Sequence, residues 1–286
     1  MAVQVNFNYP RNFRAARPGS LLRVSDGDTP VTDQPIRMVS CDTPEKAGYA
    51  GRPEVSQPKL DKCKQRLTDG FYGDLPVELR KYLITRLSTN AASKHINAGI
   101  AATKKFEEIL EKRLTRPNGK KRRTAIIPTG EIIDTYGRLL AYIAPYFAGT
   151  ANDPLPPQND TNRRTFNIEM IEEGWAAFFP IYPSLPRNID LNKAIASAEK
   201  AWFDKKGMWH EFGSKVLLGY EYRMCIKLGT ATTAQAGIKN AFQRICVDLR
   251  NLEIVDKFGF YKIPPCYRLW IWEDDFQKAK VDLGLT

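Results

Sequence analysis

Hydrophobic and polar positions follow a helical period through much of the first 210 residues. Apolar residues recur every three or four positions in 74–116, where Ile96, Ile100 and Phe106 share one stripe, so we expect this stretch to be rich in helix. A second stripe follows Asp190 and ends at Gly207, which predicts another helix. A short helix is also expected over Asn167–Gly174, because glycine is a common helix stop.

Short apolar runs between these stretches predict strands. The runs are Leu21–Val24, Ile36–Cys41, Thr124–Ile127, Ile132–Ile133 and Leu139–Ala144. Pro128-Thr129-Gly130 is a turn signal between the third run and the fourth. Residues 46–76 are rich in glycine, proline and charge and are expected to form a loop, with an added helix near Val77–Leu87.

The last part of the chain, residues 216–286, has a different pattern. Apolar and polar residues alternate from Tyr220 to Leu228, which predicts a half-buried strand. Apolar spacing over Ile238–Leu252 predicts a helix, Tyr267–Trp272 a strand, and Asp274–Leu283 a closing helix. The sequence therefore predicts a β-α-β-α extension. We expect Trp270 and Trp272 of its second strand to pack against its first helix, although exposure on one face, for stacking or for a partner, stays open.

Composition places the chain among globular proteins. It has 286 residues, of which 43% are hydrophobic and 26% charged. It contains no apolar run of the roughly 18 residues needed to cross a bilayer, and its first residues do not resemble a secretory signal. We therefore expect a cytoplasmic protein without a membrane segment, although export without a leader stays open.

The charge balance points to a polyanionic partner. Lysine and arginine number 43 against 32 acidic residues, a formal net charge of +11. A basic excess suits nucleic acid, because each neutralised phosphate releases counterions, although solubility alone also explains such an excess. Two histidines, His95 and His210, argue against a histidine-rich zinc site, and both are expected to be surface or packing residues. The 5 cysteines contain no C-x-x-C pair and are expected to be reduced.

Acidic residues gather around the first two predicted strands. Asp26, Asp28, Asp42 and Glu45 lie there with Arg37 between them. If the strand ends meet, these carboxylates converge, and oxygen ligands without histidine or cysteine suit a hard cation, Ca²⁺ or Mg²⁺. An arginine beside such a site is a natural phosphate ligand, because its planar fork binds two oxygens.

Five blocks in order make the chain similar to a known family. They are Asp26-Gly27-Asp28-Thr29, the run Ile36–Glu45, the run Asp134–Ile143, Asn167–Gly174, and the segment from Ala198 to Trp209. Together they resemble the staphylococcal nuclease family over residues 20–210. Residues 216–286 lie outside the resemblance.

The resemblance implies a fold and a domain organisation. The fold class would be α+β, a five-stranded OB-fold β-barrel with packed helices, followed by the C-terminal β-α-β-α extension. We expect an N-terminal arm over 1–20, a nuclease-like domain over 21–215 with a helical insertion at about 46–93, and an extension of unknown role over 216–286.

The resemblance also implies a role for each matching residue. Asp28, Asp42 and the carbonyl of Thr43 would bind calcium, with Asp26 supporting them. Glu45 would hold or deprotonate the attacking water, and Arg37 and Arg138 would grip the scissile phosphate. Tyr136 and Tyr182 match tyrosines near the bound nucleotide, although Tyr182 also reads as part of a packed turn.

The function that follows is a calcium-dependent phosphodiesterase, a nuclease that cuts DNA, RNA or both with little sequence specificity and leaves 3′-phosphate ends. The alternative is an inactive nucleic-acid-binding or scaffold module with the same fold. Only Pro30–Pro35 separates Thr29 from Ile36, a shortened hairpin that favours the alternative. A third possibility is an interaction domain that binds a protein partner, or a second copy, through 216–286.

Overall fold

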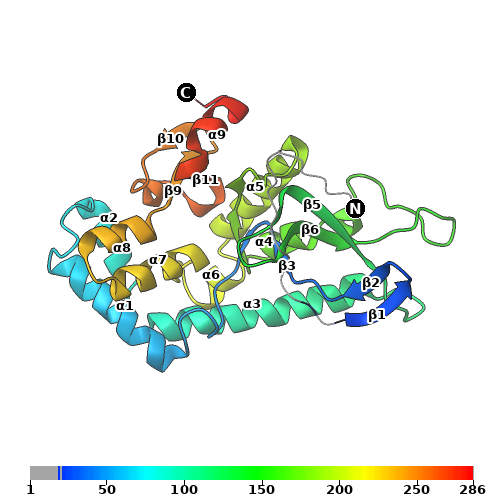
Figure 1. The fold of residues 1–286 in the computed structure, drawn as a ribbon, viewed down its shortest axis with the longest axis horizontal. Coiled ribbons are helices and arrows are strands. Elements are labelled where there is room, and N and C mark those ends of the chain that lie inside the picture. The colour runs from blue at the N-terminus through cyan, green and yellow to red at the C-terminus, as the bar shows by residue number, and fades with distance from the viewer. Residues whose placement is uncertain (1–18, 20, 286) are drawn as a thin grey trace, which may run out of the picture.

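The computed structural model describes residue 19 and residues 21–285. The arm expected over 1–20 therefore lies outside the described residues, except for Gly19. Helices and small sheets are mixed throughout, in agreement with the expected α+β class (Figure 1). In the part of the chain that the structure describes, no helix has both the length and the apolar content that a membrane crossing requires.

A three-stranded sheet carries Arg37. Its order is β3 (Ile36–Met38), β6 (Leu139–Pro145) and β5 (Thr124–Ile133). β3 runs parallel to β6 with Arg37 opposite Leu140, and β5 runs antiparallel to β6. The pairing of β3 with β6 places two segments side by side that are about a hundred residues apart in the chain.

The chain turns sharply after β3. Ser40 adopts a left-handed backbone conformation, with φ of 58°, and directs β4 (Ser40–Asp42) away from β6 onto β7 (Ala177–Phe179). The buried amide of Asn167 holds this turn, because its Nδ2 donates to the Val39 carbonyl at 2.9 Å and its Oδ1 accepts from the Ile143 N–H at 3.1 Å. Asp42 therefore ends a short buried strand.

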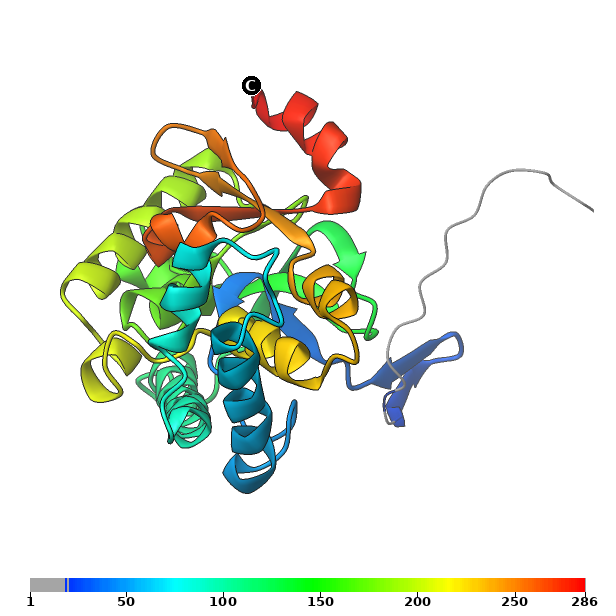
Figure 2. The ribbon, with the colours of Figure 1, turned by 90° about the vertical axis from the view of Figure 1, so that its left-hand side faces the viewer.

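The first hairpin stands apart from this sheet. β1 (Leu21–Asp26) pairs only with β2 (Thr29–Thr32) and forms a sheet of its own. Figure 2 shows the hairpin extending away from the body of the molecule. The described strands thus form four separate sheets, and a closed five-stranded barrel is not confirmed.

The end of the chain joins the body through a fourth sheet. Its order is β10 (Glu253–Val255), β9 (Arg244–Asp248), β11 (Arg268–Trp272) and β8 (Ile181–Tyr182). β11 runs parallel to β8, with Trp270 opposite Ile181. Residues 216–286 therefore complete a sheet that begins before residue 216. Trp270 is buried, but it packs against the rings of Phe179, Tyr220 and Phe260, and the helix 238–252 expected to cover it is not formed.

The helices pack around these sheets. Those before α9 contribute to one large core, and α9 packs in a second, smaller cluster. Their bounds are α1 Pro53–Thr68, α2 Val77–Ile84, α3 Ala91–Leu114, α4 Phe166–Glu172, α5 Asn188–Phe203, α6 Met208–Glu211, α7 Gly219–Thr230, α8 Ala234–Ala241 and α9 Phe276–Leu283. The long α3 runs beneath the molecule in Figure 1, with α1 and α7 side by side at one end.

Several of the expected elements are confirmed. Two are wrong because the burial of the segment differs from what its composition or its apolar–polar alternation indicated. Residues 46–76 are not a loop, since α1 buries Leu60, Cys63 and Leu67 at helical spacing despite its many charges. The segment Tyr220–Leu228 is not a strand but lies in α7, which is buried on nearly all sides, so alternation carried no information there. The helices expected over 74–116, near 167–174 and after 190 are present, as are the strand 139–144 and the closing helix.

Two further corrections concern turns. The expected helix Ile238–Leu252 is divided between α8 and β9, so the extension reads α-α-β-β-β-α and not β-α-β-α. Pro128-Thr129-Gly130 is not a turn but lies within β5, where the pairing register with β6 is irregular. Proline and glycine interrupt the strand pairing there without ending the strand.

Gly99 allows α3 to approach the backbone that carries the acidic motif. A Cβ at Gly99 would stand 2.6 Å from the Glu45 carbonyl oxygen and 2.8 Å from that of Pro44. We therefore predict that Gly99→Ala lowers the free energy of unfolding by about 1–3 kcal/mol through overpacking, although alanine elsewhere in a helix is favoured by up to about 1 kcal/mol. Urea unfolding measures the change. Gly48→Ala, where the Cβ meets nothing within 4 Å, is the control and should cost little.

Candidate functional site

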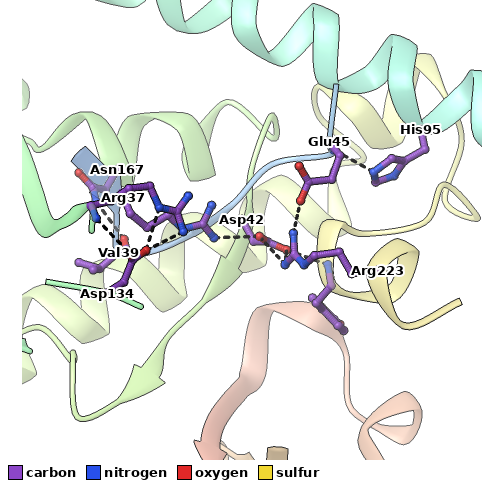
Figure 3. Close-up of polar contacts among 10 residues, drawn as sticks. Arg37, Val39, Asp42, Glu45, His95, Asp134, Asn167 and Arg223 are labelled. Atoms are coloured by element: carbon purple, nitrogen blue, oxygen red, sulfur yellow. Dashed lines mark hydrogen bonds and ion pairs between the residues drawn. The ribbon is translucent and has the colours of Figure 1, made fainter. Parts of the chain in front are cut away.

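The site is organised around the carboxylate of Asp42, which is fully buried. Arg37 Nη2 lies 3.0 Å from Asp42 Oδ1, and Arg223 Nη2 lies 3.0 Å from Oδ1 and 3.1 Å from Oδ2. The backbone N–H of Tyr220 donates to Oδ2 at 2.9 Å. Figure 3 shows the carboxylate between the two arginines. Burial by itself would raise the pKa of Asp42, but Arg223 and then Arg37 outweigh it, and the pKa is lowered.

The first turn of α7 packs directly against this carboxylate. A Cβ at Gly219 would stand 2.5 Å from Asp42 Oδ2 and 2.6 Å from the Thr43 carbonyl oxygen, so only glycine permits the contact. The first turn of a helix carries free N–H groups and a partial positive charge, and both stabilise a carboxylate. α7 thus supplies Asp42 with one guanidinium and one amide.

Glu45 is joined to the same cluster by Arg223. Nη1 of Arg223 donates to Glu45 Oε1, so this one guanidinium bridges Glu45 and Asp42. The side chain of Glu45 is 28% exposed, whereas that of Asp42 is 0% exposed. Glu45 is therefore the carboxylate of the pair that solvent or a ligand can reach.

His95 fixes the backbone of Glu45 from the side of α3. Its Nε2 accepts the Glu45 N–H at 2.8 Å, and its Nδ1 therefore carries the proton and donates to the Leu217 carbonyl, also at 2.8 Å. The ring stacks on Tyr222 with 3.9 Å between centroids. Burial lowers the pKa of His95 to about 4. His95 is thus a packing residue, as expected, but one that positions the acidic motif.

Arg138 reaches the same face of the sheet as Arg37. It immediately precedes β6, two positions before Leu140, the residue opposite Arg37, and residues two apart on a strand share a face. Arg138 Nη2 pairs with Asp134 Oδ2 at 2.7 Å, and Figure 3 places Asp134 beside Arg37. The structure therefore brings Arg37, Arg138 and Asp42 into one region.

Tyrosine rings flank this region. Tyr136 is 75% exposed, and its ring centroid lies 5.3 Å from the guanidinium of Arg138. Tyr49 is 42% exposed, and burial raises its pKa; the charge of Arg223 opposes this rise, and that of Glu45 adds to it. Two accessible rings thus lie near the guanidinium groups.

Three of the expected residues lie elsewhere. Asp26 and Asp28 are exposed on the separate β1–β2 hairpin, where the Asp28 carboxylate accepts a hydrogen bond from Thr29 at 3.0 Å. Tyr182 is buried beneath α9, donates to the Asp282 carboxylate and accepts from Lys278 at 2.9 Å. The structure does not bring these residues to the Asp42 cluster.

The donors around Asp42 do not fit a calcium ion. Calcium requires six to eight oxygen ligands, but both oxygens of Asp42 already accept N–H groups, and Thr43 O lies against Gly219. Over residue 19 and 21–285, no three acidic, histidine or cysteine side chains are grouped as a metal site. In this arrangement the guanidinium of Arg223 supplies the positive charge that a metal would bring.

Arg223 is the main residue that sequence reasoning missed. It lies 178 positions from Glu45 in the chain, and it alternates with apolar residues in a stretch interpreted as a strand. Tyr49 was missed because its segment was interpreted as a loop. No local signal links either residue to the motif at 36–45, since the link is made only by the packing of α7.

Comparison with known proteins agrees with the resemblance of the motifs. Residues 81–211 match the family model described as staphylococcal nuclease homologue. The match includes Arg138, Tyr136 and the helices α3–α6, whereas the segment 26–45 and the extension lie outside it. No curated protein matches the chain.

The Arg223 bridge predicts a large, pH-dependent effect on stability. We expect Arg223→Met to lower the free energy of unfolding at neutral pH by about 2–4 kcal/mol, because it leaves a buried carboxylate with fewer partners. The loss should shrink towards pH 4, since Asp42 can then be protonated in the variant. Urea unfolding at several pH values measures both. Arg187→Met removes an arginine that is 83% exposed and should change little; an equal loss in the two variants would contradict the assignment.

His95 predicts a second pH effect. The pKa of about 4 in the folded chain lies below the ordinary 6.5, so unfolded chains bind more protons between these values. The contribution of neutral His95 is complete above about pH 6.5 and is lost as the pH falls to 4, by about 3 kcal/mol in total. His95→Gln should flatten this part of the stability curve, whereas His210→Gln should not. With 2 histidines in the chain, ring NMR signals offer an independent check: His95 should stay neutral at pH 5.

Proposed function

We propose that the chain, whose residues 81–211 match the family model of staphylococcal nuclease homologues, binds the phosphate backbone of nucleic acid without a divalent cation. The observation that carries the proposal is the position of Arg223. Its guanidinium contacts Asp42, an expected calcium ligand, and Glu45, the residue expected to hold the attacking water, so a charged group of the chain takes the place of the ion.

The guanidinium groups retain donors for a ligand. Arg37 uses only Nη2 towards Asp42, and its side chain is 31% exposed. Arg138 is 33% exposed beside Asp134. Two planar forks on one face of the β3–β6 sheet suit the oxygens of a phosphodiester, which binds arginine through charge-assisted hydrogen bonds.

The tyrosines indicate the form of the nucleic acid. Tyr136 and Tyr49 present exposed rings near the guanidiniums, and bases stack on such rings only when they are unpaired. Backbone contacts combined with stacking give little sequence preference. The proposal therefore favours single-stranded DNA or RNA, bound with strong salt dependence, as the net charge of +11 also suggests.

Hydrolysis is the second candidate, and Glu45 favours it. Its carboxylate is 28% exposed next to Arg223 and can take a proton from a water molecule. The water oxygen would form a bond to phosphorus while the bond to the 5′ oxygen breaks, and this oxygen would take a proton from solvent. The products would carry a 3′-phosphate and a 5′-hydroxyl. Calcium dependence, which the sequence motifs imply, has no support from the donor geometry around Asp42.

One experiment separates these possibilities. We expect fluorescently labelled single-stranded DNA and RNA to bind with the same affinity in calcium and in a chelator, and log Kd to rise linearly with log salt. Arg37→Gln and Arg138→Gln should each weaken binding about tenfold, the effect of losing one charge-assisted contact. Arg187→Gln is the exposed control.

Gels of the same samples report cleavage. Cutting in chelator that Glu45→Gln abolishes would establish hydrolysis by this cluster. The proposal would be contradicted if binding or cutting occurred only with calcium and was lost in the variant Asp28→Asn. That result would require the hairpin to bring Asp28 to Asp42.

A further inference from the structure

Arg244 is a guanidinium without an anionic partner. It begins β9, and its guanidinium carbon lies 4.3 Å from the ring centroid of Trp272 and 5.2 Å from that of Phe179. Its Nε is buried and has no hydrogen-bond partner. Among the ion pairs of residues 21–285, none includes Arg244. The rings hold the group in place, but they do not satisfy its N–H donors.

A comparison within the same extension shows how unusual this is. Arg268 is buried more deeply, yet its Nε donates to the Ile263 carbonyl at 2.7 Å and its Nη1 lies 3.5 Å from Glu221. A buried cation is costly unless it is paired and hydrogen-bonded. Arg268 meets this requirement within the chain, whereas Arg244 leaves its donors for a group from outside.

Further positive charges surround Arg244. A cavity of about 30 Å³ is lined by Arg244, Arg223, Lys227 and Lys257, together with Tyr220 and Trp270. Lys257 pairs with Glu273, and Lys227 donates only to the carbonyl of Asn240. Burial lowers the pKa of Arg244 to about 10, with Arg223 adding to the effect, so the group is still charged at neutral pH. Like charges are therefore held close together at the cavity.

The size of the cavity limits its ligand. At about 10–15 Å³ for each water-sized group, a cavity of about 30 Å³ admits roughly two such groups, which excludes a base or a sugar. Two oxygens of a phosphate fit this size, and the planar donors of arginine match their geometry. Arg223 lines this cavity and also contacts Asp42, so the cavity lies next to the Asp42 cluster.

We propose that Arg244 and Arg223, with Lys227, form a subsite for one backbone phosphate of the nucleic acid that also contacts Arg37. The subsite is built by the extension, outside the segment that matches the nuclease family. It rests on the proposed function, because the ligand is the same nucleic acid. The role of the extension is then to lengthen the path of the bound strand beyond the β3–β6 sheet.

The test compares charge-removing variants in the full chain. A labelled oligothymidylate is titrated at several salt concentrations by fluorescence anisotropy. Arg244→Gln is expected to weaken binding about tenfold and to lower the salt slope by about one, as the loss of a phosphate contact does. Lys227→Gln should act in the same direction and is an independent variant should Arg244→Gln not fold. Lys239→Gln, on the exposed side of the neighbouring α8, is the matched control and should leave affinity and slope unchanged.

The outcomes separate this inference from the proposed function. If Arg37→Gln weakens binding but Arg244→Gln and Lys227→Gln do not, the subsite is wrong and the proposed function stands. Inorganic phosphate provides a second arm. If no oligonucleotide binds, but phosphate raises the melting temperature of the wild type and not of Arg244→Gln, the subsite is an anion site and the proposed function is wrong. If neither the oligonucleotide nor inorganic phosphate binds, both the subsite and the proposed function are wrong.

Discussion

The buried carboxylate of Asp42 is the constraint on which the rest of the site depends. A charge with no exposure must be matched by hydrogen-bonded cations, or it destabilises the fold. Arg37 is local, only five positions away, but Arg223 is 181 positions away in the chain. The nuclease-like segment and the extension therefore cannot satisfy this charge separately, and folding of one depends on the other.

A second buried ion pair strengthens this dependence. Glu221, in the first turn of α7, accepts from Tyr82 of α2 at 2.5 Å and pairs with Arg268 of β11 at 3.5 Å. Its Oε2 accepts the N–H of Leu218 at 3.2 Å, which caps α7. Glu221 and Arg223 are two positions apart on α7 and therefore point to opposite sides of the helix, where they meet different partners, so the position of the helix over Asp42 is fixed from two sides.

The sequence predicts the local parts of this arrangement and not the distant ones. Arg37 and Asp42 lie on the successive strands β3 and β4, and Glu45 follows three positions later, so a short motif is enough to bring them together. The pairing of β3 with β6 brings Arg138 to the same region, and the order of the motifs in the sequence had indicated that Arg138 belongs to the site. Asp28 is different, because its position depends on whether the hairpin pairs with β3, and no residue pattern within the hairpin specifies that pairing.

A helix that exposes one face to solvent was predictable from the sequence, whereas a helix that is buried on nearly all sides was not. The stripe of α3 stands out because its other side is polar. α7 is buried almost all round, with Glu221 inside, and its apolar residues from Tyr220 to Leu228 also alternate along the chain, so the pattern fits a half-buried strand as well. The alternation also explains why Arg223 was missed. It was interpreted as a polar residue on the exposed side of a strand, whereas it bridges the carboxylates of Asp42 and Glu45.

A guanidinium in the place of a metal ion changes what the cluster can do. A calcium ion exchanges with solvent and offers open coordination positions to water and phosphate. Arg223 is covalently fixed, offers only N–H donors, and makes the group of Arg37, Arg223, Asp42 and Glu45 neutral as a whole. A neutral group does not attract a polyanion over distance. The attraction must therefore come from cations without carboxylate partners around it. Among the described residues, Arg244 and Lys227 are two such cations, and both line the cavity that Arg223 also lines.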